Sequence, residues 1–267
     1  MPFRTQQFEP DSALGQHVKC MWTFEQNQAE HNQVVLLPDT NIELLFNCGA
    51  PNVMTAAGGG QIELPPVLLN GLQKQPTRPK VTGDCQFIAV RFNVWAMRHF
   101  IDLPNHIDSD DLRMIALDSL WQDFGRVVRE AVEHYGYAEA AARIQQFLLD
   151  IQRPHPAARS IRIASETLHN AHGQVAIHEL IGDSHLSPRQ FERQFKYFTG
   201  MLPKSYARLV RHEAVRGSLL SDPNRSLVTL AQDFGYTDQA HFSHDFKTFT
   251  SYTPGQYATA LQSVRQQ

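Results

Sequence analysis

The residues FERQFKYFTGMLPKSYA (191–207) return 51 positions later as FSHDFKTFTSYTPGQYA (242–258). Eight of the 17 aligned positions are identical, and half of those are aromatic. A repeat of this quality indicates two copies of one structural unit. Each copy reads as a helix, a short turn, a second helix opened by Ser187 or Asp238 as N-cap, and a proline-led segment. The C-terminal part of the chain is therefore predicted to be all-α, with two similar helix pairs.

In the second helix of the first copy, Phe191, Phe195 and Phe198 share one face at about 100° per residue. Three basic residues fall on the opposite face: Arg189, Arg193 and Lys196. One face can pack, while the other can meet phosphates and guanine edges. Such a helix fits the major groove of B-DNA when a preceding helix and a short turn hold it there. The repeat thus predicts a DNA-binding unit, although a solvated basic face on a bundle helix is the simpler alternative for one copy alone.

The charge is unevenly distributed along the chain. Residues 159–267 contain 12 Lys and Arg against 9 Asp and Glu, and the residues before them contain 12 against 18, which gives the net charge of −3. Between Ser187 and Arg216 the balance becomes seven basic residues against two acidic ones. A local basic patch of this kind suggests a polyanionic partner for the C-terminal part.

Two stretches resemble the AraC/XylS family of transcription regulators. LAQDFGYTDQAHFSHDFKTFTSYTPGQY (230–257) is similar to the signature region of that family, and SPRQFERQFKYFTGMLPKSY (187–206) to the matching part of its first helix-turn-helix. The resemblance covers roughly Ser160 to Ala260, with a long helix from about Pro203 to Leu219 between the copies. It implies two helix-turn-helix units that dock into successive major-groove segments about one helical turn apart.

The resemblance also implies which residues contact DNA. In the first recognition helix, base contacts fall on Arg189, Glu192 and Arg193, with Gln190 as a flanking contact. In the second they fall on Gln239, Ser243 and His244, with His241 nearby. We add three lysines as contacts on the same units: Lys196, Lys204 and Lys247.

Two positions depart from the family pattern. His244 stands where the family usually has arginine, and Ser251 stands where it usually has glycine. A neutral histidine offers one donor instead of a bidentate fork, so we expect looser or pH-dependent readout by the second unit.

The N-terminal part is predicted to be rich in strands. From about Gln33 to Phe92, short apolar runs are broken by turn residues, which is typical of a β-barrel or sandwich. The runs are VVLL (34–37), IELLFN (42–47), VLLN (67–70) and FIAVRFN (87–93). Helical periodicity follows between Asp111 and Gln152, with a break at Gly136. This order is similar to the cupin-like sensor domain and helical hairpin that many AraC-type regulators carry.

The sequence as a whole therefore predicts an α+β protein. We expect a cupin-like sensor and dimerisation domain with a helical hairpin at 1–152, a linker at 153–159, and a double helix-turn-helix domain at 160–267. The linker is placed at Arg153-Pro154-His155-Pro156, because two prolines so close together end a helix. The predicted hairpin helices are compatible with either a dimer interface or packing against their own barrel.

An effector pocket in the barrel would need apolar walls and a few polar groups. The residues that could supply them are Trp22, Phe24, Glu43, Phe46, Arg91 and Trp95. For each of them plain core or surface is the favoured interpretation, and nothing in the sequence names the effector. Metal binding is not expected, because His31, His99 and His106 form no H-x-H cluster with a downstream glutamate.

The main alternative is a cupin-type enzyme or metal sensor with a fused DNA-binding domain, and the missing metal-ligand cluster speaks against it. A repair-type regulator with a reactive cysteine is disfavoured because Cys20, Cys48 and Cys85 form no metal set around a nucleophilic thiol. We therefore expect no enzymatic activity and no cofactor. The expected partners are double-stranded promoter DNA, an unknown small-molecule effector, a second copy of the chain and RNA polymerase. With no leader and no stretch of 18 apolar residues, a cytoplasmic location is expected.

Overall fold

The computed structural model describes residues 4–26, 35–49, 53–55, 61–78, 80–82, 84–103 and 115–265. Contacts divide the chain into two compact units. The first, the sheet unit, contains Met1–Leu36, Asn41–Gly71 and Arg78–Ala158. The second, the helical unit, contains Leu37–Thr40, Leu72–Thr77 and Arg159–Gln267.

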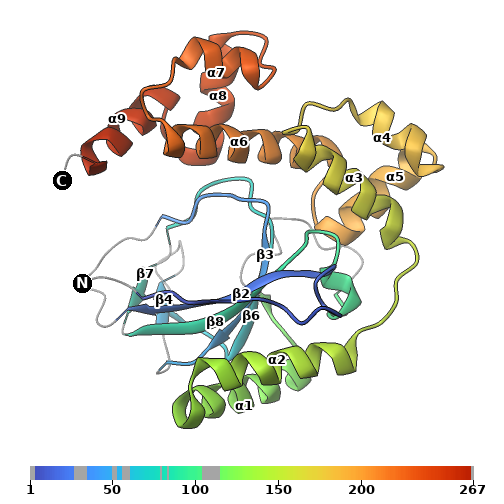
Figure 1. The fold of residues 1–267 in the computed structure, drawn as a ribbon, viewed down its shortest axis with the longest axis vertical. Helices are drawn as coiled ribbons and strands as arrows, with labels where there is room; N and C mark the ends of the chain where they lie inside the picture. Colours follow the sequence, from blue (N-terminus) through green and yellow to red (C-terminus); the bar gives the residue numbers. More distant parts are fainter. Residues whose placement is uncertain are drawn as a thin grey trace. The chain divides into compact units, whose positions relative to one another are not determined.

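The sheet unit is built on an antiparallel six-stranded sheet (Figure 1). Its strands, in spatial order, are β1 (Gln7–Phe8), β2 (Val18–Gln26), β8 (Cys85–Phe92), β3 (Ile42–Asn47), β6 (Val67–Asn70) and β9 (Ile115–Ala116). A second sheet of three strands has the order β5 (Gln61–Glu63), β4 (Val53–Thr55) and β7 (Lys80–Thr82). One short 3₁₀ helix, Met97–His99, follows β8.

Three of the four predicted strand runs are confirmed. IELLFN is β3, VLLN is β6, and FIAVRF lies within β8. The prediction for VVLL is wrong over its described part, since Val35–Leu37 forms no strand. The sequence pattern also failed to indicate β2, the longest strand of the described chain, because its residues VKCMWTFEQ form no continuous apolar run and its register shifts between Val18 and Cys20.

The helical hairpin is confirmed as α1 (Ser119–Tyr135) and α2 (Tyr137–Ile151). Its predicted start at Asp111 is wrong, because Ile115–Ala116 pairs with β6 as β9. Gly136 joins them with a φ of 86°, a conformation that only glycine adopts without strain. Gln122 fixes α1 to the sheet, because its side-chain amide accepts from the Val67 N–H at 3.1 Å and donates to the Val67 carbonyl at 2.8 Å. At Gly125 the helix comes so close that a Cβ would lie 2.4 Å from Cγ2 of Val67.

The two faces of the six-stranded sheet differ in burial. On one face Ile42, Leu44 and Phe46 are fully buried, and so are their cross-strand partners on β8, namely Ile88, Val90 and Phe92. Phe46 meets Phe124 of α1 at 5.8 Å between ring centroids, so this is the helix-covered face. The opposite face is less uniformly buried, because Ala89 and Leu68 are buried there while six other residues are half-buried: Trp22, Phe24, Glu43, Leu45, Phe87 and Arg91.

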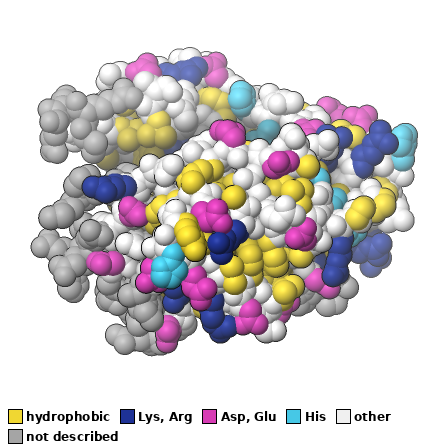
Figure 2. Space-filling view, turned by 60° about the horizontal axis from the view of Figure 1, so that its bottom comes forward, with side chains coloured by type: hydrophobic (Ala, Val, Ile, Leu, Met, Phe, Trp, Pro, Cys, Tyr) yellow, Lys and Arg dark blue, Asp and Glu magenta, His cyan; other side chains and the backbone are white. Residues whose placement is uncertain are grey.

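The outer side of α1 keeps several large apolar residues exposed. Leu120, Val127 and Tyr135 have exposed fractions of 55%, 39% and 69%. Figure 2 turns this part of the molecule forward and shows hydrophobic side chains interspersed with acidic and basic ones. The inner side of the hairpin packs against its own sheet, and a dimer through the outer side stays a prediction.

The helical unit contains α3 from Arg159 onward and all later helices (Figure 1). They are α3 (Ala158–Asn170), α4 (Ile177–Ser184), α5 (Pro188–Thr199), α6 (Pro203–Ser221), α7 (Leu227–Asp233), α8 (Gln239–Thr250) and α9 (Pro254–Arg265). None of the helices in the described ranges combines the length and the apolar character needed to cross a membrane.

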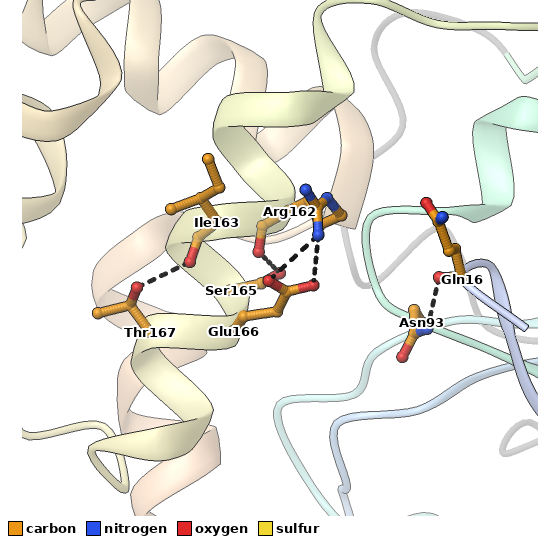
Figure 3. Close-up of polar contacts among 7 residues, drawn as sticks. All are labelled: Gln16, Asn93, Arg162, Ile163, Ser165, Glu166 and Thr167. Atoms are coloured by element: carbon orange, nitrogen blue, oxygen red, sulfur yellow. Dashed lines mark hydrogen bonds and ion pairs between the residues drawn. The ribbon is translucent and has the colours of Figure 1, made fainter.

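Local hydrogen bonds support α3 (Figure 3). Arg162 pairs with Glu166 one turn later at 3.3 Å, and the Thr167 hydroxyl donates to the Ile163 carbonyl at 2.8 Å. In the sheet unit, a separate contact joins the Asn93 side chain to the Gln16 carbonyl at 2.8 Å. Such side-chain bonds to the backbone satisfy polar groups locally and fix the loop and helix in place.

Candidate nucleic-acid interface

Two consecutive helix pairs, α4–α5 and α7–α8, form the candidate interface. The second helices, α5 and α8, have 12 residues each and begin 51 positions apart, as the sequence repeat requires. The predicted N-caps are confirmed: the Ser187 side chain accepts from the Gln190 N–H, and the Asp238 side chain accepts from the His241 N–H. In α5 the Gln190 side chain also accepts from the Ser187 N–H, which completes a capping box.

The predicted apolar face of the second helix is confirmed in both copies. Phe191, Phe195 and Phe198 of α5 are fully buried. Their counterparts in α8, Phe242, Phe246 and Phe249, are at most 4% exposed. Three phenylalanines at helical spacing therefore fix which side of each helix stays free.

A threonine ends each second helix in the same way. The Thr199 hydroxyl lies 2.8 Å from the Phe195 carbonyl and accepts from the Met201 N–H at 3.1 Å. In the second copy Thr250 repeats these contacts with Phe246 and Tyr252, at 2.9 and 3.0 Å. The next residue is left-handed in both copies, at φ 75° for Gly200 and φ 67° for Ser251. Ser251 is thus a non-glycine residue in a glycine position.

The residues predicted to contact DNA lie on the free side of these helices or beside it. Nine side chains are exposed: Arg189, Gln190, Glu192, Arg193, Lys204, Gln239, His241, His244 and Lys247. Lys196 and Ser243 are half-buried. All except Lys204 belong to α5 or α8, and Lys204 stands in the first turn of α6.

Gln190 and His241 make side-chain contacts within the protein. The Gln190 side-chain oxygen accepts from the Ser187 hydroxyl at 2.8 Å, which leaves its amide nitrogen as the group available to a partner. The Nδ1 atom of His241 lies 3.1 Å from the Thr237 hydroxyl, and its ring packs edge-on against Tyr236. Both residues are therefore better suited to support the helix start than to read a base freely.

An ion pair with a buried carboxylate holds α8 against α6. Asp245 of α8 is 3% exposed at its side chain, and Arg208 of α6 donates to it through Nε at 2.8 Å and also through Nη2. The Tyr236 hydroxyl donates to the second oxygen of Asp245 at 3.3 Å. Gln194 occupies the equivalent place in the first copy. The second copy is thus fixed by a charged contact that the first copy lacks.

His212 of α6 is fully buried next to that contact. Its ring packs against Phe246 and Phe249, with centroids 5.1 and 4.8 Å apart. Neither ring nitrogen has a hydrogen-bond partner among the described residues. Burial, together with the nearby charge of Arg216, lowers the pKa of His212 to about 3, so the ring is neutral at neutral pH.

In the sheet unit, three of the predicted effector contacts lie together on the opposite face of the sheet. Arg91 donates to Glu43 Oε1 through Nε and Nη2 at 2.9 and 2.7 Å, and the Trp22 indole N–H donates to the same oxygen at 2.9 Å. The Arg91 guanidinium lies 5.4 Å from the centre of the Trp22 ring. Phe24 extends the aromatic surface, because it stacks at 5.4 Å on Phe87, which also touches Trp22.

The other two predicted effector contacts lie elsewhere. Phe46 is buried on the helix-covered face. Trp95 follows the end of β8 and packs beside His17 and His99, at 5.2 and 5.5 Å between centroids. Burial and the neighbouring His99 lower the pKa of His17 to about 4. His31 and His106 lie outside the described residues, and within the described ranges no three His, Cys, Asp or Glu side chains are arranged to hold a metal ion.

Comparison with known proteins adds two family matches. Residues 182–260 match a family described as a helix-turn-helix domain, and residues 6–107 match a domain of unknown function, DUF6597. No curated protein matches the chain.

Several solved structures are similar to the chain. ToxT from Vibrio cholerae O395 bound to (E)-4-(8-methylnaphthalen-1-yl)but-3-enoic acid is 9% identical over 98% of this chain and 100% of its own, with a TM-score of 0.45. ToxT of Vibrio cholerae strain SCE256, bound to an unsaturated fatty acid, is 12% identical over 98% and 96%, with a TM-score of 0.44. The AraC-like transcriptional activator CuxR is 13% identical over 74% and 73%, with a TM-score of 0.24. At such identities and scores these likenesses do not bear on ligands or partners.

The helix-turn-helix match runs from Gly182 in α4 to Ala260 in α9. It therefore contains both stretches that resemble the AraC/XylS signature, with their buried phenylalanines, capped helices and exposed basic residues. This match supports an AraC-type, DNA-binding transcription regulator.

Proposed function

We propose that the chain binds promoter DNA sequence-specifically through two helix-turn-helix units, with α5 and α8 as the recognition helices. The observation that carries this is the pairing, in each copy, of a buried phenylalanine face with an exposed polar face. A helix held from behind in this way can enter the major groove without losing its packing. Residues 153–159 act as the linker between this domain and the sensor domain.

Within this proposal the two units differ in what they read. Arg189 and Arg193 suit guanine, which an arginine recognises through two hydrogen bonds, and Glu192 can accept from the amino group of cytosine. In the second unit Gln239 suits adenine, whereas Ser243 and His244 each offer a single directed contact. Lys196, Lys204 and Lys247 serve phosphates, which position the protein without reading sequence.

The experiment is a binding titration of the full-length protein with DNA from its own promoter region, followed by fluorescence anisotropy at several salt concentrations. Binding should weaken steeply with salt, because neutralised phosphates release counterions. Lys204→Ala should weaken binding to all sequences alike and make the salt slope shallower by about 1. Arg162→Ala is the matched control, since Arg162 lies in the same unit on α3 and pairs with Glu166.

The proposal fails if the folded protein binds its promoter region no better than unrelated DNA of the same length. It also fails if Arg162→Ala and a double Arg189→Ala, Arg193→Ala variant reduce binding equally. Circular dichroism of each variant shows whether the fold is retained.

We further propose that a small molecule bound in the N-terminal domain controls this activity. The support is the group formed by Trp22, Phe24, Glu43 and Arg91, where an aromatic surface adjoins a charged pair, as ligand sites commonly require. Trp22→Ala and Arg91→Ala should abolish the response of DNA binding to the effector while leaving effector-free binding unchanged. A response that persists in both variants would place the effector elsewhere.

A further inference from the structure

A cavity of about 630 Å³ lies at one end of the sheet unit, between the helix-covered face and the α1–α2 turn. The residues that line it are Glu25, Cys48, Gly49, Gln86, Arg129, Val132, Glu133, Gly136 and Tyr137. They come from the ends of β2 and β3, the start of β8, the last turns of α1 and the first residue of α2. The Trp22, Glu43 and Arg91 group lies on the other face of the sheet, so the two places are separate.

The sheet side of the cavity departs from the apolar pattern of its own face. Along this face the row Met21, Val90 and Leu44 is fully buried and apolar. Two residues further along β2 and β3, Thr23 and Phe46 flank Ile88. The next row instead pairs Glu25 with Gln86, and Cys48 adjoins Gln86 through its backbone N–H at 2.9 Å. The core face therefore turns polar where the cavity begins.

The wall of the cavity that α1 forms also changes from apolar to polar at this end of the sheet. Arg129, Val132, Glu133 and Gly136 follow one another at helical spacing, so they form one side of α1, and this side faces the cavity. Arg129 donates to the Asn47 carbonyl at 3.4 Å, and it makes no ion pair with any described carboxylate. Earlier in the same helix the sheet-facing residues are apolar or small, such as Trp121, Gly125 and Val128.

Tyr137 adds a buried hydroxyl that lies near the Glu25 carboxylate. The hydroxyl oxygen is buried and makes no hydrogen bond of normal length within the described residues. Burial and the nearby Glu25 carboxylate raise the pKa of Tyr137 well above its usual value, so the group stays a donor. Burial also raises the pKa of Cys48 to about 11, which leaves a thiol and not a nucleophilic thiolate at the cavity wall.

We propose that this cavity binds a small zwitterion of the amino-acid class. Arg129 supplies donors for a carboxylate, and Glu25 and Glu133 supply acceptors for an ammonium group. A charge or hydroxyl at a helix–sheet junction is costly to leave without a partner, and a ligand carrying both charges satisfies both sets at once. The volume falls within the range of small-molecule sites, and Val132 and the Tyr137 ring offer apolar wall for a side chain.

The probes are the individual proteinogenic α-amino acids, tested at millimolar concentration on the full-length protein without DNA. Thermal shift identifies the best one, and isothermal titration calorimetry measures its Kd. Two analogues of that amino acid, one without the carboxylate and one without the amino group, should each bind about 10-fold more weakly or worse, because one charge-assisted contact is lost. An analogue that binds as well as the amino acid would overturn the zwitterion assignment.

Variants then locate the site. Arg129→Met and Glu25→Gln should each raise the Kd about 10- to 100-fold. Arg129→Lys, which keeps the charge, should bind better than Arg129→Met. The matched controls are Arg126→Met and Glu130→Gln, which change exposed residues of the same helix outside the cavity and should bind like the wild type.

The inference is overturned if no amino acid stabilises the wild type, or if the cavity variants bind as tightly as the controls. Because the measurement contains no DNA, either result leaves the proposed DNA binding untouched. Conversely, loss of promoter binding in the recognition-helix variants would not change the amino-acid Kd. The two proposals can therefore fail independently.

Discussion

The two copies of the repeat share their buried residues and differ in the residues that surround them. Both second helices bury three phenylalanines and end on a threonine that bonds backbone groups. The first copy has a glycine at the left-handed cap and arginines on its free side. The second has Ser251 at the cap, His244 on the free side, and the Asp245–Arg208 pair behind it.

This difference separates what makes the unit fold from what makes it specific. Identical buried residues keep the geometry of the helix pair, while the exposed positions are free to change their contacts. Under the proposed mode of binding, the first copy is the stronger reader of bases. The second copy is held by an additional ion pair, and its exposed side chains offer fewer directed hydrogen bonds to bases. In the proposed mode of binding this suits a unit that adds affinity.

The largest expected effect is on stability and concerns the Asp245–Arg208 ion pair. Arg208→Ala should lower the free energy of unfolding by about 3 kcal/mol, because it leaves the Asp245 carboxylate buried without its cation. Gln194→Ala, at the equivalent place of Asp245 in the first copy, should change it by less than about 0.5 kcal/mol. Urea denaturation of both variants measures the contrast, and equal losses would show that the pair does not distinguish the copies.

Exchanging the arginine and the histidine between the two copies tests whether they differ in base recognition. Arg193→His should weaken binding to the native site by about 1–3 kcal/mol, since a bidentate fork becomes a single contact. His244→Arg should strengthen binding, by about 1 kcal/mol, through added charge and a second hydrogen bond. Anisotropy titrations against single-base variants of the site show whether the loss is confined to one position. No loss in Arg193→His, or no gain in His244→Arg, would contradict the proposed difference between the two helices.

The stability of the folded protein should depend on pH through His212, which packs against the second copy. The folded protein keeps this ring neutral, with a pKa of about 3, whereas the unfolded chain binds a proton below about pH 6.5. The unfolded state therefore holds more protons between these values, and stability should fall as the pH drops from about 6.5 toward 3.

His212→Leu should remove this part of the pH dependence. At neutral pH the variant should also gain about 1–2 kcal/mol, because two unpaired buried nitrogens are replaced by carbon. Thermal melts over the pH range give the measurement, and His178→Leu on α4 is a control that stays outside the α6–α8 contact. An unchanged acid slope in His212→Leu would show that other groups carry it.

The smallest effect is expected at the caps. Ser251→Gly should stabilise the protein by about 0.5–1 kcal/mol, because glycine adopts the left-handed conformation without strain. The reciprocal Gly200→Ser should destabilise the first copy by about 1 kcal/mol. Differential scanning calorimetry can resolve both changes. A loss of stability in Ser251→Gly would mean that the serine side chain makes a contact worth more than the strain.

The helical unit could be predicted closely because its signals are local. Caps, helical periodicity and a repeat each act within a few residues, and Pro203 and Pro254 mark the starts of the next helices. Strands depend on partners far along the chain, so β2 was missed and VVLL was wrongly assigned. The residues VKCMWTFEQ can be identified as a strand only when the strands and helices that pack against them are known.

The predicted effector contacts also show that sequence patterns do not reveal which residues meet in space. Glu43 and Phe46 are three residues apart on β3, so they point to opposite faces, and no single pocket on one face could use both. Nothing local announced the cavity at Arg129 and Tyr137. The available signal was the presence of two charged residues, Arg129 and Glu133, on the side of α1 that is otherwise apolar and small.

Helix α6 has a consequence for the spacing of the two units. Its 19 residues rise about 28 Å, at 1.5 Å per residue, and each residue also turns the helix by about 100°. An inserted residue would therefore do more than lengthen the spacer, because it would swing everything beyond it around the helix axis. No lengthening of the DNA site by whole base pairs, at roughly 36° each, restores both distance and phase. The length of α6 and the rotation of the second unit about its axis therefore change together. Only an insertion of about one full helical turn keeps that rotation unchanged.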